Sequence, residues 1–219
     1  METHMSRLCF RISMSLDGFI AGPDQSVKNP LGVGGENLHE WVLPLRAWRA
    51  AHNLEGGEVN ESNTIIEEQN ANIGATIMGR HMFGGHPGPW DSNNPWKGWW
   101  KNNPPFHHPV FVVTHHEREP LEMEGGTTFH FVTDGIEPAL EQARRAAKGK
   151  DVALAGGARI AQQYLAAGHV DQMDLHMVPI LLGRGERLFS DVGDNMHGMQ
   201  LVRTVPMRDV IHLRFGRQK

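Results

Sequence analysis

The chain has 219 residues, of which 39% are hydrophobic and 21% are charged, a globular composition that excludes intrinsic disorder. Its single cysteine rules out an intrachain disulfide, and a net charge of -4 without a basic field gives no sign of binding to nucleic acid or a membrane surface. No apolar run is long enough to span a membrane and no signal sequence is visible, so we expect a cytoplasmic protein. We expect residues 1–6 to be disordered or foreign to the native chain, and residues 7–219 to form a single domain.

The first third of the chain predicts a strand at residues 8–14, a second strand at 73–78, and helices at 38–51 and 63–71. Apolar side chains recur at helical spacing through the first helix, but Pro44 must break or start it because proline lacks the amide that a helix interior needs. These elements already indicate alternation of strands and helices.

Residues 84–109 hold six of the 13 prolines and four of the six tryptophans. This proline content excludes a regular helix or strand, and the tryptophans argue against disorder. We therefore predict a long loop. Three roles remain open for it: a lid over a substrate, a segment anchored to the core by its tryptophans, or an interface with a partner, and the anchoring role is favoured.

The remaining sequence predicts strands and helices in alternation, with the helix at residues 134–149 capped by Asp134 and by a capping box completed at Glu137. The other predicted elements are strands at 110–114, 127–132, 151–155 and 172–182, a helix at 158–167, and an antiparallel pair at 199–205 and 209–215. This pattern predicts an α/β fold with a mixed sheet.

The strongest functional signal is DVALAGGARIAQQYL, residues 151–165, in which a strand runs through Gly156 and Gly157 into a helix. Without Cβ atoms, the glycines let a phosphate approach the backbone, and the free N–H groups of the helix start attract an anion. The alternative is a tight turn required only for packing. The spacing is not that of GxGxxG, so an ordinary Rossmann fold is not predicted.

A second segment of this kind is ATIMGRHMF, residues 75–83, where Gly79 ends a strand and Arg80 and His81 follow. Arg80 at a helix start can hold a phosphate through two N–H groups, although a surface arginine is the alternative. Two such turns in one α/β chain favour a dinucleotide, because its phosphates can reach more than one loop.

A third segment is SMSLDGFIAG, residues 13–22, in which a strand ends in a turn carrying Asp17. Ligands of α/β sheets bind beyond strand ends, so this turn is a candidate to contact a ligand ring. A plain Asp-Gly turn is the alternative reading.

The 14 histidines raise the question of a metal site. His108 and His115 lie at opposite ends of the strand predicted at 110–114, so they cannot easily share one ion, and HExxH is absent. We predict no metal site. His115 and His116 are instead expected in a loop beside a cofactor's ribose or phosphate.

Together these segments resemble the dihydrofolate reductase-like superfamily, and most closely stand-alone relatives of the reductase domain of bifunctional riboflavin-biosynthesis deaminase-reductases. The matching pieces are SMSLDGFIAG, TIMGRHMF, VFVVTHH and DVALAGGARIAQQYLAAGHVDQMDLHMVPILLGRGERLF, which follow in order across most of the chain. The cysteine pattern of the zinc deaminase half is absent. The resemblance implies a three-layer α/β fold, with a mixed, mostly parallel sheet, flanking helices and a C-terminal antiparallel strand pair.

The resemblance also implies NADPH as cofactor, with Arg80 a candidate for its 2′-phosphate, and a homodimeric assembly. The residues implied for the cofactor are Gly79, Arg80, His81, Thr114, His115, His116, Ala155, Gly156, Gly157, Ala158, Arg159 and Ile160. Those implied for the nicotinamide and substrate ring are Ser13, Met14, Ile20 and Ala21.

Two departures from the superfamily pattern matter for the chemistry. Met82 stands where dihydrofolate reductases usually carry a hydroxyl residue, which removes one expected phosphate contact. The carboxylate that orients and protonates a pterin has no certain counterpart here, and the candidates for a catalytic acid are Asp17, Glu36 and Glu40.

The resulting prediction is an NADPH-dependent reductase that transfers hydride to a small heteroaromatic substrate, either pterin-like or like a pyrimidine precursor of riboflavin. The alternative is a nucleotide- or pterin-binding protein that keeps the scaffold without the chemistry. Turnover separates the two, because a binding protein would hold the cofactor without oxidising it.

Overall fold

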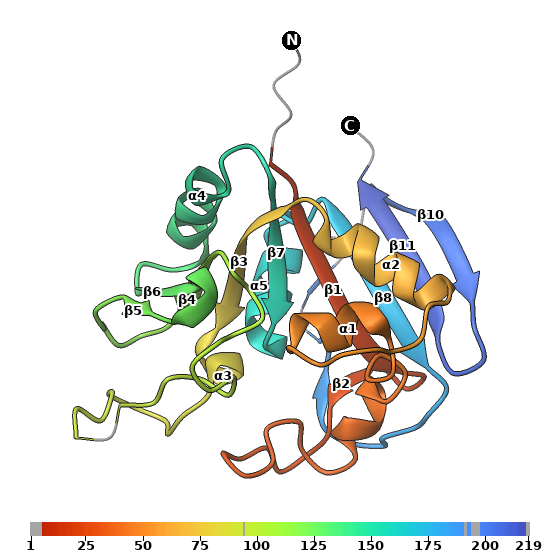
Figure 1. Ribbon diagram of the computed structural model, residues 1–219, viewed down its shortest axis with the longest axis horizontal. Helices are drawn as coiled ribbons and strands as arrows, with labels where there is room; N and C mark the ends of the chain where they lie inside the picture. The colour runs from red at the N-terminus through yellow and green to blue at the C-terminus, as the bar shows by residue number, and fades with distance from the viewer. Residues whose placement is uncertain (1–5, 94, 191, 194–197, 218–219) are drawn as a thin grey trace.

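A nine-stranded sheet forms the centre of the computed structural model, which describes residues 6–93, 95–190, 192–193 and 198–217 (Figure 1). The strands lie in the order β10-β11-β8-β1-β7-β3-β4-β6-β5. From β8 to β6 neighbouring strands are parallel, whereas β11, β10 and β5 are antiparallel to their neighbours. The predicted α/β class, the mostly parallel sheet and the C-terminal antiparallel pair are confirmed.

The strands of this sheet are β1 (Leu8–Ser15), β3 (Ile73–Gly79), β4 (Pro109–Val113), β5 (Leu121–Glu122), β6 (Thr128–Val132), β7 (Asp151–Gly156), β8 (Gln172–Val178), β10 (Met199–Pro206) and β11 (Ile211–Arg217). A separate two-stranded sheet pairs β2 (Phe19–Ala21) with β9 (Glu186–Arg187). The helices are η1 (Gly35–His39), α1 (Arg46–Ala51), α2 (Glu61–Asn70), α3 (Arg80–Phe83), η2 (Glu124–Gly126), α4 (Ile136–Ala147) and α5 (Ala158–Ala166).

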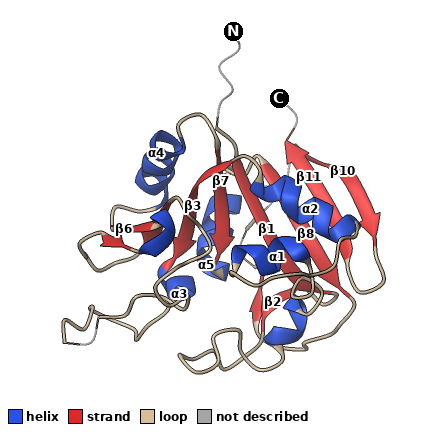
Figure 2. Cartoon of the chain, viewed as in Figure 1, coloured by secondary structure: helices blue, strands red, loops and turns tan. Residues whose placement is uncertain are grey.

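Helices cover both faces of the sheet, with α1 and α2 on one face and α4 and α5 on the other (Figure 2). The alternation of side chains along β1 explains this arrangement, because Leu8 and Phe10 are fully buried in the main core with the apolar side of α4. The intervening residues of β1, Cys9 and Arg11, face α2 and line a polar cavity. The two layers between helices and sheet therefore differ in chemistry.

Three expected elements differ in detail from the structure. The helix predicted at 38–51 is two short helices, since Pro44 separates η1 from α1. The expected cap by Asp134 is wrong, because α4 begins after Gly135 and no side chain caps it. The strand predicted to reach residue 182 ends at Val178, because proline follows it and cannot continue the ladder.

The long loop between α3 and β4 extends from the carboxyl edge of the sheet, where it is drawn in yellow-green in Figure 1. The described residues of the segment 84–109 contain no helix and only the first residue of a strand, as predicted. Residues 1–5 of the expected loose start lie outside the described residues, while the Ser6 hydroxyl donates a hydrogen bond to the carbonyl of Lys150. Of the helices in the described part of the chain, none combines the length and apolar character needed to cross a membrane.

Candidate functional site

Four of the segments singled out in the sequence follow four strands that are neighbours in the sheet. β1, β7, β3 and β4 lie side by side and run parallel, so their carboxyl ends meet at one edge. This edge is at the bottom of Figure 1, where the chain leaves β3 for α3 and β7 for α5. The fold therefore brings together turns that are more than 100 residues apart in the chain.

The turn between β7 and α5 has the open backbone that the sequence predicted. Gly156 and Gly157 have φ angles of +124° and +89°, which L side chains rarely adopt. A Cβ atom at Gly157 would lie 3.5 Å from Ile160 Cγ2 and 3.8 Å from Gly79 Cα, so this turn touches the turn after β3. The first intrahelical hydrogen bond runs from the amide of Ala161 to the carbonyl of Gly157. Earlier amides of α5 have no partner within the helix, which is the ordinary basis of anion binding.

The turn after β3 places Arg80 at the start of α3, but its guanidinium group contacts the long loop. It donates hydrogen bonds to the carbonyls of Gly84 and His86, the latter at 2.9 Å. Its central carbon lies 3.6 Å from the ring centroid of Trp90. Burial lowers the pKa of Arg80, with a further contribution from the charge of Arg118. The adjacent His81 is exposed to solvent.

The turn after β4 is held by the side chain of Thr114 and by Trp90. The Thr114 hydroxyl accepts a hydrogen bond of 3.2 Å from the amide of His116, and the Trp90 indole N–H donates to the carbonyl of His116 at 2.9 Å. Thr114 is buried and His115 is exposed. Thr114, His115 and His116 thus follow the carboxyl end of β4 directly, as predicted. The side chain of His115 is exposed to solvent rather than enclosed in a site.

Asp17, a candidate for the catalytic acid, joins the turn after β1 to the loop at residues 182–183. Its carboxylate accepts hydrogen bonds from the amides of Leu182 and Gly183, at 3.1 and 2.7 Å, and from the Ser15 hydroxyl at 2.6 Å. The bond from Ser15, followed by those from the two amides, lowers the pKa of Asp17 to about 2. A carboxylate that stays ionised at neutral pH is a poor proton donor, and its bonds give Asp17 a positioning role in this turn. The expected catalytic role of Asp17 stays a prediction.

Glu36 in η1 and Glu40 just after it are both exposed, whereas Leu38 between them is buried against Val178 and Val210. In the described part of the chain neither carboxylate hydrogen-bonds to Ser13, whose hydroxyl is bonded to Trp41, so a catalytic role for Glu36 or Glu40 stays a prediction. Their place at the start of a reshaped first helical region was the only signal for them in the sequence.

The four residues expected at the substrate ring divide between the two faces of the sheet. Ser13 faces α2, and its hydroxyl accepts a hydrogen bond of 3.1 Å from the Trp41 indole. Met14 and Ile20 pack into the main core on the opposite face, so neither lines a pocket with Ser13. Ala21 is buried in β2. The alternation of side chains along β1 explains this division, and a substrate ring bordered by all four residues stays a prediction.

Sequence reasoning missed a buried histidine pair beside Ser13. His176 lies directly opposite Ser13 in the β1–β8 ladder, and the Trp41 ring lies 4.7 Å from the ring of His176 and 5.0 Å from that of His212. The two Nδ1 atoms are 2.8 Å apart. The only signal was a histidine inside each of two predicted strands, which does not reveal that the strands are neighbours.

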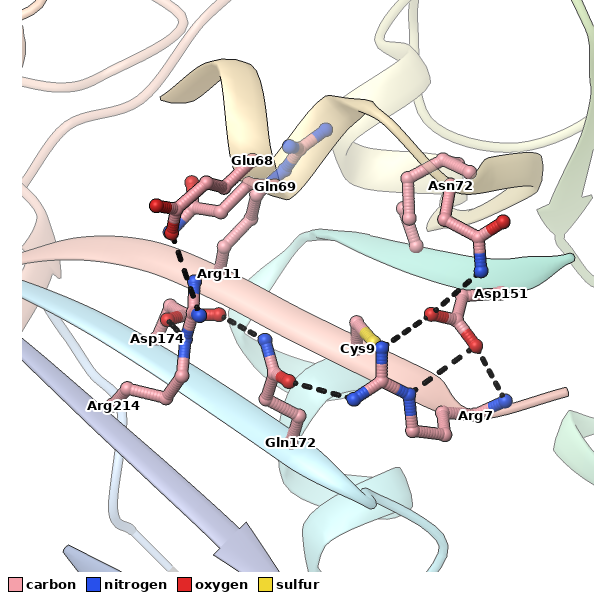
Figure 3. Close-up of a pocket in the computed structure, with 12 residues that line it drawn as sticks. Arg7, Cys9, Arg11, Glu68, Gln69, Asn72, Asp151, Gln172, Asp174 and Arg214 are labelled. Atoms are coloured by element: carbon pink, nitrogen blue, oxygen red, sulfur yellow. Dashed lines mark hydrogen bonds and ion pairs between the residues drawn. The ribbon is translucent and has the colours of Figure 1, made fainter. Parts of the chain in front are cut away.

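A cavity of about 140 Å³ lies under α2 at the amino ends of the strands, away from the turns described above (Figure 3). None of the residues expected to bind a cofactor or substrate lines it. Its charges are largely matched: Asp151 with Arg7 at 2.6 Å, and Asp174 with Arg214 at 2.6 Å. Cys9 also lines it, and burial raises the pKa of its thiol to about 12.

The fold and the edge just described define an α/β protein of the dihydrofolate reductase-like class. The chain belongs to the RibD C-terminal domain family, whose model matches residues 7–213. The expected membership and fold are both confirmed.

Individual relatives are more distant. The chain is 36% identical over 76 residues to the uncharacterised protein YyaP of Bacillus subtilis strain 168. The matched region is 34% of this chain and 38% of that protein. A putative riboflavin biosynthesis protein from Shewanella sp. PV-4 has a TM-score of 0.59 at 18% identity, covering 97% of this chain and 99% of that chain. Dihydrofolate reductase from Enterococcus faecalis, solved with NADP(H) and RAB-propyl, has a TM-score of 0.52 at 13% identity over 98% of both chains. The two structural likenesses, both under 25% identity, concern the fold alone.

Proposed function

We propose that this chain is an NADPH-dependent reductase that transfers hydride to a small heteroaromatic substrate, pterin-like or like a pyrimidine precursor of riboflavin. The observation that carries the proposal is the meeting of four candidate turns on the adjacent strands β1, β7, β3 and β4. Membership in the RibD C-terminal domain family supports a reductase-type activity. A structural neighbour solved with NADP(H) supports the choice of cofactor.

The turn after β7 fits a pyrophosphate. Apart from its chain neighbours, a Cβ placed on Gly156 or Gly157 would approach no atom more closely than 3.5 Å, and Gly157 is only half-buried. In the proposed role, Ala155 and these glycines let the phosphates approach, while the amides of Ala158, Arg159 and Ile160 donate to them. Gly79, Arg80 and His81 form the second phosphate turn, and Thr114, His115 and His116 border the adenosine.

The bound dinucleotide would supply the hydride, and the protein would supply position and protons. Ser13 and Ala21 would border the reacting rings, and the Asp17 carboxylate would hold their turn against the amides of Leu182 and Gly183. Because Asp17 stays ionised, the proton would come from water or from the substrate's own acidic groups.

Titration of the purified protein with NADPH and with NADH tests the proposal. Six tryptophans allow binding to be followed by energy transfer to the reduced nicotinamide. We expect tighter binding of NADPH, followed by its oxidation when a pterin or pyrimidine substrate is added. Failure to bind either nucleotide would contradict the proposal.

A non-catalytic binding protein is the second candidate, favoured by the structural use of Asp17 and by Met82 at the usual hydroxyl position. NADPH binding without oxidation across pterins, pyrimidines and flavin precursors would support this candidate.

Sedimentation of the same sample tests the homodimer that the family resemblance implies.

A further inference from the structure

The polar cavity under α2 holds one arginine, Arg11, that has no carboxylate partner among the described residues. Arg11 lies directly opposite Asp174 in the β1–β8 ladder (Figure 3). Both oxygens of Asp174 are already taken, one by Arg214 Nε at 2.6 Å and one by the Gln172 amide nitrogen at 2.7 Å. Arg11 Nη1 donates to the side-chain oxygen of Asn70 at 2.5 Å. The other N–H groups of this guanidinium are therefore available to a ligand.

The other charges around this cavity are compensated. The Arg7 guanidinium pairs with Asp151 at 2.6 Å. Glu68, exposed at the rim, pairs at 2.7 Å with Arg203, which lies outside the cavity. One positive charge is left over, that of Arg11. A single negative charge would balance it, whereas a dianion would leave one charge unpaired in a half-enclosed site.

The solvation of Arg11 agrees with this balance. Burial lowers the pKa of its guanidinium, and the charge of Asp174 offsets this effect only in part. An anion bound next to Arg11 would complete the compensation.

Gln69 supplies an unused acceptor in the same cavity. Its side chain is 8% exposed, and its amide nitrogen lies 3.4 Å from His176 Nε2. Its Oε1 is buried without a hydrogen-bond partner. Because Gln69 precedes Asn70 in α2, this oxygen and the Arg11 guanidinium belong to the same part of the cavity. A buried carbonyl oxygen without a donor favours a ligand that carries an O–H group.

The remaining wall and the size of the cavity limit the ligand further. The side chains of Ile73 and Ala153 and the uncharged thiol of Cys9 form an apolar part of the wall. The volume of about 140 Å³ is that of about four or five water molecules in the liquid, enough for about three carbons with their polar groups. Asn72 and Glu68 in the lining are exposed, so a solute can enter from this side.

We propose that this cavity binds a short hydroxycarboxylate with the size and chemistry of lactate. The Arg11 guanidinium donates to the carboxylate, the Gln69 Oε1 accepts from the hydroxyl, and the carbon chain lies against Ile73 and Ala153. The site is at the amino ends of the strands, whereas the candidate turns for the cofactor are at the carboxyl ends. It is therefore independent of the proposed reductase activity.

Calorimetric titration with lactate, propionate and inorganic phosphate, in a buffer without other carboxylates, tests this inference. Propionate has the carbon chain and carboxylate of lactate but lacks its hydroxyl. We expect lactate to bind about fivefold more tightly than propionate, because only lactate can donate to Gln69. Phosphate should bind more weakly than lactate, since its second charge has no partner in the cavity.

Three variants assign the binding groups. In Arg11→Met, which keeps the length of the side chain without its charge, lactate affinity should fall at least about tenfold. In Gln69→Leu, propionate should bind as before and the advantage of lactate should vanish. Arg118→Met is the matched control, since Arg118 is also half-buried and bonded to the chain, through the carbonyl of Trp96 at 2.6 Å. It should bind lactate like the parent.

Each contrary result would overturn the inference. If the unaltered chain does not bind lactate, or binds propionate or phosphate at least as tightly, the cavity is not a hydroxycarboxylate site. Undiminished lactate affinity in Arg11→Met would place the binding elsewhere. The comparison of lactate with propionate uses the unaltered chain, so it remains decisive if thermal melts show that Gln69→Leu does not fold. NADPH titration of the same sample tests the proposed function separately.

Discussion

His176 and His212 meet Nδ1 to Nδ1 at 2.8 Å on neighbouring strands of the sheet, and both rings are buried under Trp41. His212 Nε2 lies 2.8 Å from the Ser62 hydroxyl, and His176 Nε2 lies 3.4 Å from the Gln69 amide nitrogen. One set of proton positions satisfies this row of hydrogen bonds: Gln69 donates to His176, His176 donates to His212, and His212 donates to Ser62. Both imidazoles are then neutral.

Acid should therefore destabilise the protein through this pair. Burial, followed by the charge of Arg203, lowers the pKa of His212 to about 4, and burial, followed by the charge of His212, lowers the pKa of His176 well below its ordinary range. The unfolded chain binds the protons first, so this stability is complete above about pH 6.5 and falls as the pH drops toward 4. We expect His212 alone to account for about 2 kcal/mol of loss between pH 7 and pH 5.

Urea unfolding at the two pH values measures this loss. In His212→Asn the difference between pH 7 and pH 5 should shrink, whereas His86→Asn, at an exposed histidine, should retain it. An undiminished pH dependence in His212→Asn would show that the pair is not its source.

Gly157→Val should separate nucleotide binding from folding. A β-branched residue at φ +89° is strained by about 1 to 2 kcal/mol, and its side chain would cover amides proposed to hold the pyrophosphate. We expect NADPH affinity to fall at least about tenfold, read by the energy-transfer titration. Gly149→Val is the matched control, since Gly149 has φ +85° and lies just before the amino end of β7. Equal affinities in the two variants would remove the turn after β7 from the site.

Asp17→Ala should lower the melting temperature, because two amides and the Ser15 hydroxyl lose their acceptor. The pKa of about 2 in the folded state lies below the ordinary value of 3.8, so this stabilisation is present above pH 4 and fades as the pH falls toward 2. Scanning calorimetry at pH 7 and pH 3 should show a smaller gap between variant and parent at pH 3. Asp134→Ala, at an exposed aspartate that caps nothing, should melt like the parent.

Arg7→Ala should be the most destabilising of the arginine replacements around the cavity. The Asp151 carboxylate is 2% exposed and accepts from the Arg7 guanidinium, the Arg7 amide and the Asn72 amide nitrogen. Removing the guanidinium leaves much of this buried charge uncompensated, at a cost of about 2 to 3 kcal/mol in the free energy of unfolding. Arg145→Ala, which breaks a surface pair with Glu141, should cost at most about 0.5 kcal/mol. Equal losses for the two variants in urea would contradict this assignment.

The strands, the helices and the glycine turns at the sheet edge could be predicted from the sequence because their signals are local. A strand, two glycines and a helix start stand next to each other at residues 151–165, and the structure realises them with positive φ angles. Parallel strands then bring such turns to one edge.

Contacts between distant segments could not be predicted in this way. The Trp41–Ser13 bond and the placement of Arg118 over Trp90 join residues 28 positions apart, and the histidine pair joins residues 36 apart. Their partners depend on strand order and loop path, which local patterns do not contain. The opposite facing of Met14 and Ser13 was predictable, since side chains alternate along a strand.

The burial of Cys9 has a practical consequence for labelling this protein with a fluorescent dye. With its pKa raised to about 12, this sole thiol is almost entirely uncharged at neutral pH and reacts slowly with maleimides. A cysteine introduced on the exposed part of the long loop, at Lys97 for example, would thus take up a dye selectively. Single-site labelling therefore needs one introduced cysteine, and Cys9 can stay in its strand.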